Sequence, residues 1–146
     1  MAAHSTGAPD LGLDLGKIPD LTDPKIRKRL SPMAIEAFFR ILEKWNIRAE
    51  DGMALLGGVS RGRYYGLRND RKGVLTQDEL TRVSLLIGIF KALNILFAQK
   101  LADEWIRRPN SNTMFQRSTP LTVMMHGGVP AMLSVRRLLD ARRGGR

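Results

Sequence analysis

The chain is organised around one long apolar stretch, TQDELTRVSLLIGIFKALNILF, residues 76–97. Its first four residues have the spacing of a capping box, in which two side chains satisfy free amides at a helix start. Apolar residues then recur every three or four positions, which predicts a helix. They cover most of its circumference and comprise Leu80, Val83, Leu86, Ile87, Ile89, Phe90, Leu93, Leu96 and Phe97. Such a helix must be covered on several sides, so we expect it to form the central core, a dimer interface, or both.

The residues before this stretch predict three further helices. Ser31-Pro32 resembles a helix start, with a serine cap and a proline in the first turn, and this helix is expected to end at Trp45. A short helix over 50–56 should end at Gly57-Gly58, and a third helix over 60–69 should begin at a serine cap. A short helix, a glycine turn and another short helix form the helix-turn-helix pattern.

The residues after the stretch continue the helical pattern. A helical segment is expected over 101–107, a helix should run from Pro120 to Gly127-Gly128, and a last helix should cover 129–143. Because no segment has a strong strand pattern, the predicted fold is all-α. Residues 1–30 have no clear period and are expected to form a flexible N-terminal arm.

Composition limits the possible classes of protein. At 146 residues, the chain fits one compact domain or two small subdomains with a shared core. It has no cysteine, which suits a reducing cytosol, and its start does not have the pattern of a signal peptide. The longest apolar run, 83–98, is short for a membrane span and contains Lys91 and Asn94. We therefore expect a cytoplasmic protein that makes no membrane contact.

The net charge of +10 favours a polyanionic partner, with nucleic acid the leading candidate. The second helix of a helix-turn-helix places its first turn against base edges, where an arginine can bind guanine. The candidate DNA-binding residues are Ser60, Arg61, Arg63, Tyr65, Arg68, Asn69, Arg71 and Lys72. The alternative is a helical hairpin with an ordinary charged face. Gly62 and Gly66 either weaken this helix or permit close approach to a backbone.

Catalysis has little support in the sequence. His4 and His126 share no helical face, which disfavours a zinc site. The adjacent carboxylates of Asp78-Glu79 and Asp103-Glu104 point in different directions on a helix, so neither pair forms a shared acid–base site. A glycine-rich phosphate loop is also absent. We expect no catalytic residue, no metal and no cofactor.

The C-terminal residues 135–146 form a second basic segment, with five arginines against Asp140. Apolar residues hold a helical face almost to the terminus, which indicates that the end docks on another surface. Arg146, after Gly144-Gly145, could reach a pocket built for phosphates, because its planar guanidinium matches phosphate oxygens. The alternative is a solvated helix end, where cations are favoured in any case.

Several motifs together resemble the Xre/MbcA/ParS antitoxin family over about residues 31–146. They are LLIGIFKAL at 85–93, WIRRPN at 105–110 with Phe115, TPL at 119–121 with Met124 and Gly127-Gly128, and VRRLL at 135–139. The resemblance implies a bacterial type II antitoxin that is usually a homodimer. It implies a RES-domain toxin that degrades NAD or transfers ADP-ribose as the partner. The antitoxin would block the toxin's active site and repress its own operon by binding operator DNA.

The resemblance also implies a division of the chain. Residues 31–75 would form an Xre-like helix-turn-helix domain, and residues 76–146 a dimerisation and toxin-binding domain. The candidate toxin-binding residues are Arg136, Arg137, Arg142, Arg143, Gly144, Gly145 and Arg146. The rival hypothesis is a plain helix-turn-helix transcriptional regulator without a toxin partner. A small enzyme is disfavoured by the missing catalytic constellation.

Overall fold

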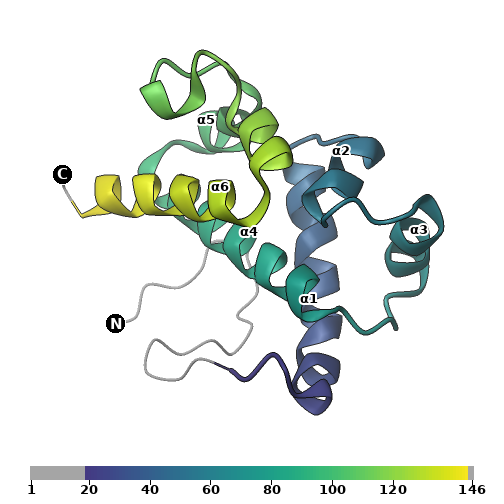
Figure 1. Ribbon diagram of the computed structural model, residues 1–146. Helices are drawn as coiled ribbons and strands as arrows, with labels where there is room; N and C mark the ends of the chain where they lie inside the picture. The colour runs from purple at the N-terminus through teal and green to yellow at the C-terminus, as the bar shows by residue number, and fades with distance from the viewer. Residues whose placement is uncertain (1–18, 145–146) are drawn as a thin grey trace.

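The computed structural model describes residues 19–144, which fold into six α-helices and two short 3₁₀-helices (Figure 1). The elements are α1 (Pro24–Lys44), α2 (Ala49–Leu55), α3 (Arg61–Asp70), α4 (Gln77–Leu96), α5 (Gln99–Glu104), η1 (Trp105–Arg107), η2 (Thr113–Phe115) and α6 (Pro120–Arg143). No strand occurs within the described range, and the all-α prediction is confirmed. Predictions for residues 1–18, Gly145 and Arg146 lie outside it.

Helix α4 lies at the centre of the fold, as its apolar circumference predicts. The capping box forms: the Thr76 side chain accepts from the Glu79 amide, and the Glu79 carboxylate accepts from the Thr76 amide. Helices α1 and α6 make its most extensive contacts. Leu86 and Ile89 of α4 are completely buried. Burying each such side chain contributes about 1.5–3 kcal/mol, so α4 supplies much of the core.

Helix α1 begins earlier than its sequence suggests. Asp23 caps it by accepting from the Lys25 amide, and Pro24 occupies its first turn. The predicted start at Ser31-Pro32 is therefore wrong, and residues 24–30 belong to the helix rather than to a flexible arm. The buried Ser31 hydroxyl donates to the Arg27 carbonyl and accepts from the Leu75 amide. Ser31 thus joins α1 to the segment before α4 instead of capping a helix.

Helices α2 and α3 form the predicted helix-turn-helix. The turn needs two glycines, because Gly57 and Gly58 have φ values of +100° and +82°. Tyr64 of α3 is buried against α1, where its ring meets Phe39 edge-on at 5.2 Å between centroids. The helices pack closely at Gly52, where a Cβ atom would meet the Tyr64 side chain.

The C-terminal half wraps α4 with α5, η1, η2 and α6. Trp105 and Phe115 pack edge-on with ring centroids 5.9 Å apart, and Arg107 Nε donates to the Trp45 carbonyl at 2.7 Å. Helix α6 contains one residue with non-helical angles, Gly128, at φ 65° and ψ −148°. The predicted break at Gly127-Gly128 is therefore confirmed. Beyond it, the second arm of α6 lies across α4 (Figure 1). Within residues 19–144, no helix has both the length and the apolar character needed to span a membrane.

Candidate nucleic-acid interface and a second basic surface

Two glycines, Gly62 and Gly66, lie one turn apart at exposed positions of α3. Ser60 caps the helix by accepting from the Arg63 amide at 3.1 Å, as predicted. A Cβ atom added at Gly62 or Gly66 would meet nothing within 4 Å. These glycines are therefore not required by packing inside the described chain. They leave the backbone of α3 open to close approach by an outside surface.

Arg61 and Tyr65 lie one helical turn apart on a flank of α3. The Arg61 guanidinium carbon is 5.3 Å from the centroid of the Tyr65 ring, which is cation–π distance. Tyr65 in turn packs edge-on against the buried Tyr64 ring, at 5.2 Å between centroids. This stack supports an exposed arginine in the first turn of the helix. Arg61 keeps its guanidinium available for an outside hydrogen-bond acceptor.

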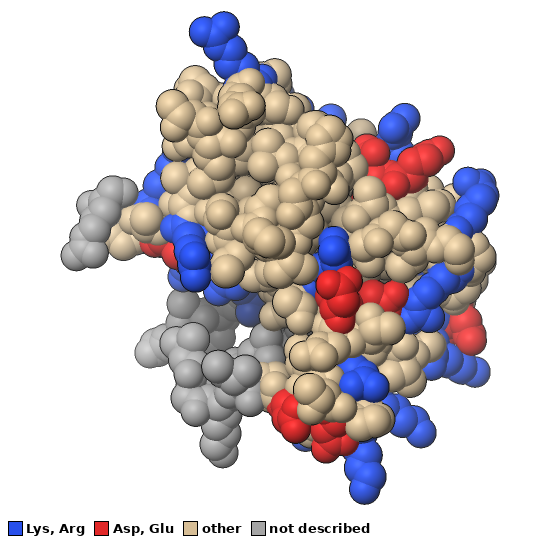
Figure 2. Space-filling view, in the orientation of Figure 1, with Lys and Arg blue, Asp and Glu red and all other residues tan. Residues whose placement is uncertain are grey.

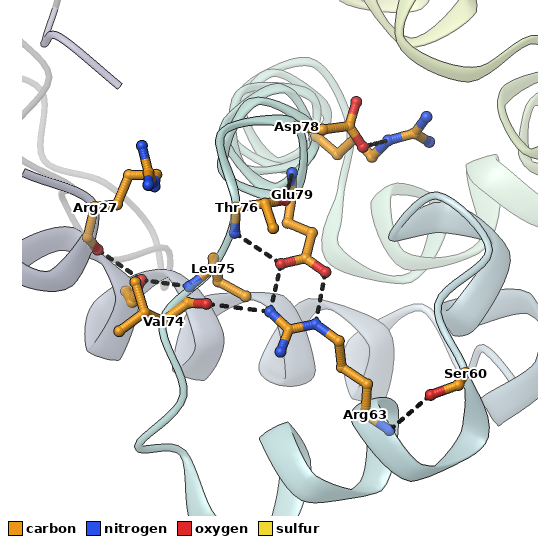
Figure 3. Close-up of polar contacts among 10 residues, drawn as sticks. Arg27, Ser60, Arg63, Val74, Leu75, Thr76, Asp78 and Glu79 are labelled. Atoms are coloured by element: carbon orange, nitrogen blue, oxygen red, sulfur yellow. Dashed lines mark hydrogen bonds and ion pairs between the residues drawn. The ribbon is translucent and has the colours of Figure 1, made fainter. Parts of the chain in front are cut away.

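Arg63 has a different environment from the one its position suggests. Its Nε donates to Glu79 Oε2 at 2.8 Å, and its Nη2 donates to Glu79 Oε1 at 2.6 Å and to the Val74 carbonyl at 3.1 Å (Figure 3). Glu79 is only 4% exposed and also accepts from the Thr76 amide. The guanidinium therefore fastens α3 to the start of α4. We revise Arg63 from a base-reading residue to one that positions α3.

The electrostatics agree with this ion pair. The hydrogen bonds to Glu79 raise the pKa of the Arg63 guanidinium. Burial raises the pKa of the Glu79 carboxyl, but the hydrogen bonds from Arg63 and Thr76 outweigh burial and hold this pKa below its ordinary value. Both groups therefore stay charged at neutral pH. A bidentate, charge-assisted pair of this kind fixes orientation as well as distance.

The remaining candidate DNA-binding residues are Arg68, Asn69, Arg71 and Lys72, at the end of α3 and in the connector to α4. All four are exposed. In the described part of the chain, none of the three cations forms an ion pair. Lys and Arg side chains gather along the side of the molecule that α3 occupies (Figure 2). This side presents a positive surface suited to phosphates.

The second basic surface lies on the last turns of α6, at the opposite side of the view in Figure 1. Arg136 Nε pairs with Asp140 at 3.1 Å, and its guanidinium lies against Gly88 of α4, where a Cβ atom would collide with it. Arg143 also pairs with Asp140, at 3.6 Å. Arg136 therefore packs within the fold. Arg137 and Gly144 are exposed, and Arg142 is half-buried.

Sequence reasoning found the basic residues but missed Glu79 as a site residue. Its place in the capping box was recognised, whereas its pairing with a residue sixteen positions earlier depends on the fold. No group of three His, Asp or Glu side chains within residues 19–144 is arranged to hold a metal ion. The geometry brings Ser60, Arg61 and Tyr65 together at one end of α3 and Arg68 to Lys72 at the other.

Comparison with known proteins agrees with this two-sided arrangement. Residues 26–88 match the Xre-like helix-turn-helix domain of antitoxins, and residues 92–145 match the C-terminal toxin-binding domain of Xre/MbcA/ParS antitoxins. The "Uncharacterized protein y4oB" of Sinorhizobium fredii (strain NBRC 101917 / NGR234) is 41% identical over 115 residues, which cover 78% of this chain and 87% of that protein. No solved structure gives a significant match. The chain therefore belongs to the Xre/MbcA/ParS family of antitoxins, with a DNA-binding helix-turn-helix half followed by a toxin-binding half.

Proposed function

We propose that this antitoxin neutralises a RES-domain toxin that consumes NAD or transfers ADP-ribose, and that it represses its own operon as a homodimer. The observation that carries the proposal is the separation of two basic surfaces onto α3 and the end of α6 (Figure 1). The first falls in the segment matched to a helix-turn-helix and the second in the segment matched to a toxin-binding domain. Each surface has its own partner, so both tasks can be performed by one chain.

On the toxin side, we propose that the end of α6 blocks the nucleotide pocket. Arg137, Arg142 and Arg143 lie on the last turns of this helix, and Gly144 follows them. A pocket for NAD must accommodate a pyrophosphate, and a guanidinium matches its oxygens in two hydrogen bonds. Arg146, two residues further on, would supply that group. Neutralisation by occupancy requires no catalytic residue.

On the DNA side, we propose that α3 enters the major groove of the operator. Arg61, held on Tyr65, would read a guanine, and Ser60 with the first amides of α3 would bind a phosphate. Arg68, Arg71 and Lys72 would contact the backbone on one side. A homodimer would present two copies of α3 to successive half-sites.

Co-expression of the toxin with the full chain or with a chain truncated before Gly144 tests the proposal. We expect the full chain to protect cells and the truncated chain to protect them less, while both bind operator DNA equally. A chain that binds DNA but fails to protect against any RES-domain toxin would favour a plain transcriptional regulator. Equal protection by the two chains would contradict the proposed role of the tail.

A further inference from the structure

A hollow of about 220 Å³ lies between the end of α1 and the inner flank of α3. Phe39, Leu42 and Ile47 contribute apolar walls. Arg40 joins Arg68 and Arg71 in lining the same hollow, although it lies about thirty residues earlier in the sequence. The packing of α1 against α3 therefore brings Arg40 and two arginines that are distant from it in the sequence to the lining of one hollow.

The charge of this hollow is unbalanced. Its lining contains three arginines against a single carboxylate, that of Glu43. None of the three arginines forms an ion pair with any of the residues from 19 to 144, and all three are exposed. Like charges that converge on a partly apolar hollow repel one another, and a bound anion relieves this repulsion. The unbalanced positive charge of the hollow therefore favours an anion.

The remaining polar groups suit a phosphate in particular. Burial raises the pKa of the Tyr64 hydroxyl, despite the opposing charge of Arg68, so the hydroxyl stays neutral and can donate a hydrogen bond. The Asn46 side chain supplies a further amide donor to the same lining. Guanidinium groups bind phosphate oxygens through two parallel hydrogen bonds. Three arginines with two neutral donors can satisfy the several oxygens of one phosphate.

We infer that this hollow between α1 and α3 is a phosphate-binding site in which Arg40 acts together with Arg68 and Arg71. The favoured source of the phosphate is the DNA backbone, because Arg68 lies in the last turn of the helix proposed to enter the groove and Arg71 is its C-cap. This source rests on the proposed DNA-binding function. A free phosphate compound would be bound by the same groups, and the experiment below distinguishes it from the DNA backbone.

The first arm of the experiment measures binding to a duplex of arbitrary sequence by fluorescence anisotropy at several salt concentrations. Arg40→Ala is compared with Arg108→Ala, which removes the same charge from an exposed position in the C-terminal half. Loss of one phosphate contact lowers the slope of log affinity against log salt by about 0.9. Over a fourfold rise in salt, the Arg40→Ala protein should thus lose about 3.5-fold less affinity than the wild type.

The second arm titrates inorganic pyrophosphate into the same proteins by calorimetry, with thermal melting as the check of folding. Glu43→Gln removes the opposing carboxylate and should strengthen binding of either probe. If Arg40→Ala has a shallower salt slope than the wild type and Arg108→Ala does not, the result supports the DNA backbone as the source of the phosphate. An unchanged slope, with pyrophosphate binding that Arg40→Ala abolishes, supports the site and assigns it to a free phosphate compound.

Three results would overturn the inference or separate it from the proposed function. If Arg40→Ala matches the wild type in both arms, the phosphate site is refuted. If Arg108→Ala flattens the salt slope as much as Arg40→Ala does, the DNA backbone is refuted as the source of the phosphate. A wild-type chain that binds no duplex contradicts the proposed DNA-binding function instead. In that case, the pyrophosphate titration alone decides whether the hollow binds phosphate.

Discussion

Replacing Glu79 by glutamine should destabilise the fold and weaken DNA binding, although Glu79 itself is buried. The carboxylate accepts two hydrogen bonds from Arg63, at 2.6 and 2.8 Å, and one from the Thr76 amide. The side-chain oxygen of glutamine can still accept the hydrogen bond from the Thr76 amide. Its NH₂ group is a donor, however, and cannot accept the hydrogen bond that Arg63 now donates to the second carboxylate oxygen. One charge-assisted hydrogen bond, worth about 1.5–3 kcal/mol, is then lost.

The side-chain exposure of Arg63, 35%, reduces this cost, because the released guanidinium can be hydrated. We therefore expect a loss of about 2 kcal/mol of unfolding free energy, which corresponds to roughly 6–10 °C in melting temperature. Asp78→Asn is the matched control. It removes the neighbouring carboxylate, which is 58% exposed and pairs with Arg82 at 2.7 Å, and should cost below about 1 kcal/mol.

The pH dependence gives a second readout of the same pair. The pKa of Glu79 in the folded protein lies below its value of about 4.3 in the unfolded chain. The contribution of the ionised carboxylate to the free energy of unfolding is therefore complete at pH values above about 4.3. It disappears as the pH falls through the native pKa. The stability gap between wild type and Glu79→Gln, measured by urea denaturation, should be constant near neutral pH and narrow in acid. A gap that is absent at neutral pH, or equal to that of Asp78→Asn, refutes the reasoning.

Three further predictions test other contacts. Ser31→Ala leaves the Leu75 amide without its acceptor, and urea denaturation should show a loss of about 1–3 kcal/mol; a loss under about 0.5 kcal/mol would show that water replaces the hydroxyl. Gly88→Ala should stabilise the Arg136→Ala protein by about 1 kcal/mol, because alanine has the higher helix propensity. It should stabilise the wild type less, because the new methyl group meets the Arg136 guanidinium. A double-mutant cycle that shows no coupling between the two positions contradicts this contact. Arg61→Ala should weaken operator binding by about 1–3 kcal/mol and relax base preference at one position, as measured by gel shift on a set of single-base variants; unchanged preference removes Arg61 as a base reader.

The sequence predicts those elements whose signals are local. The capping box at Thr76, the glycine pair at 57–58 and the break near Gly128 each lie within a few residues of the feature they produce. Ser31-Pro32 misleads for the same reason, because it has a local cap signature. The actual partner of Ser31 is the amide of Leu75, 44 residues away.

The same distinction between local and long-range signals applies to the candidate site. The positive charge of α3 and of the tail can be read from composition, and Ser60 can be identified as a cap from its position before a helix. The role of Arg63 cannot, because a first-turn arginine looks the same whether it points outward or toward a carboxylate on another helix. Arg40 likewise joins Arg68 and Arg71 only once α1 packs against α3.

The turn at Gly128 sets the direction of the second arm of α6. Its φ and ψ of 65° and −148° lie near a region that is essentially restricted to glycine, so a side chain at this position would be strained. One residue without a side chain thus sets the angle between the two arms of α6. If the end of α6 binds the toxin as proposed, a substitution at Gly128 would change the direction in which the arginines of its last turns are presented.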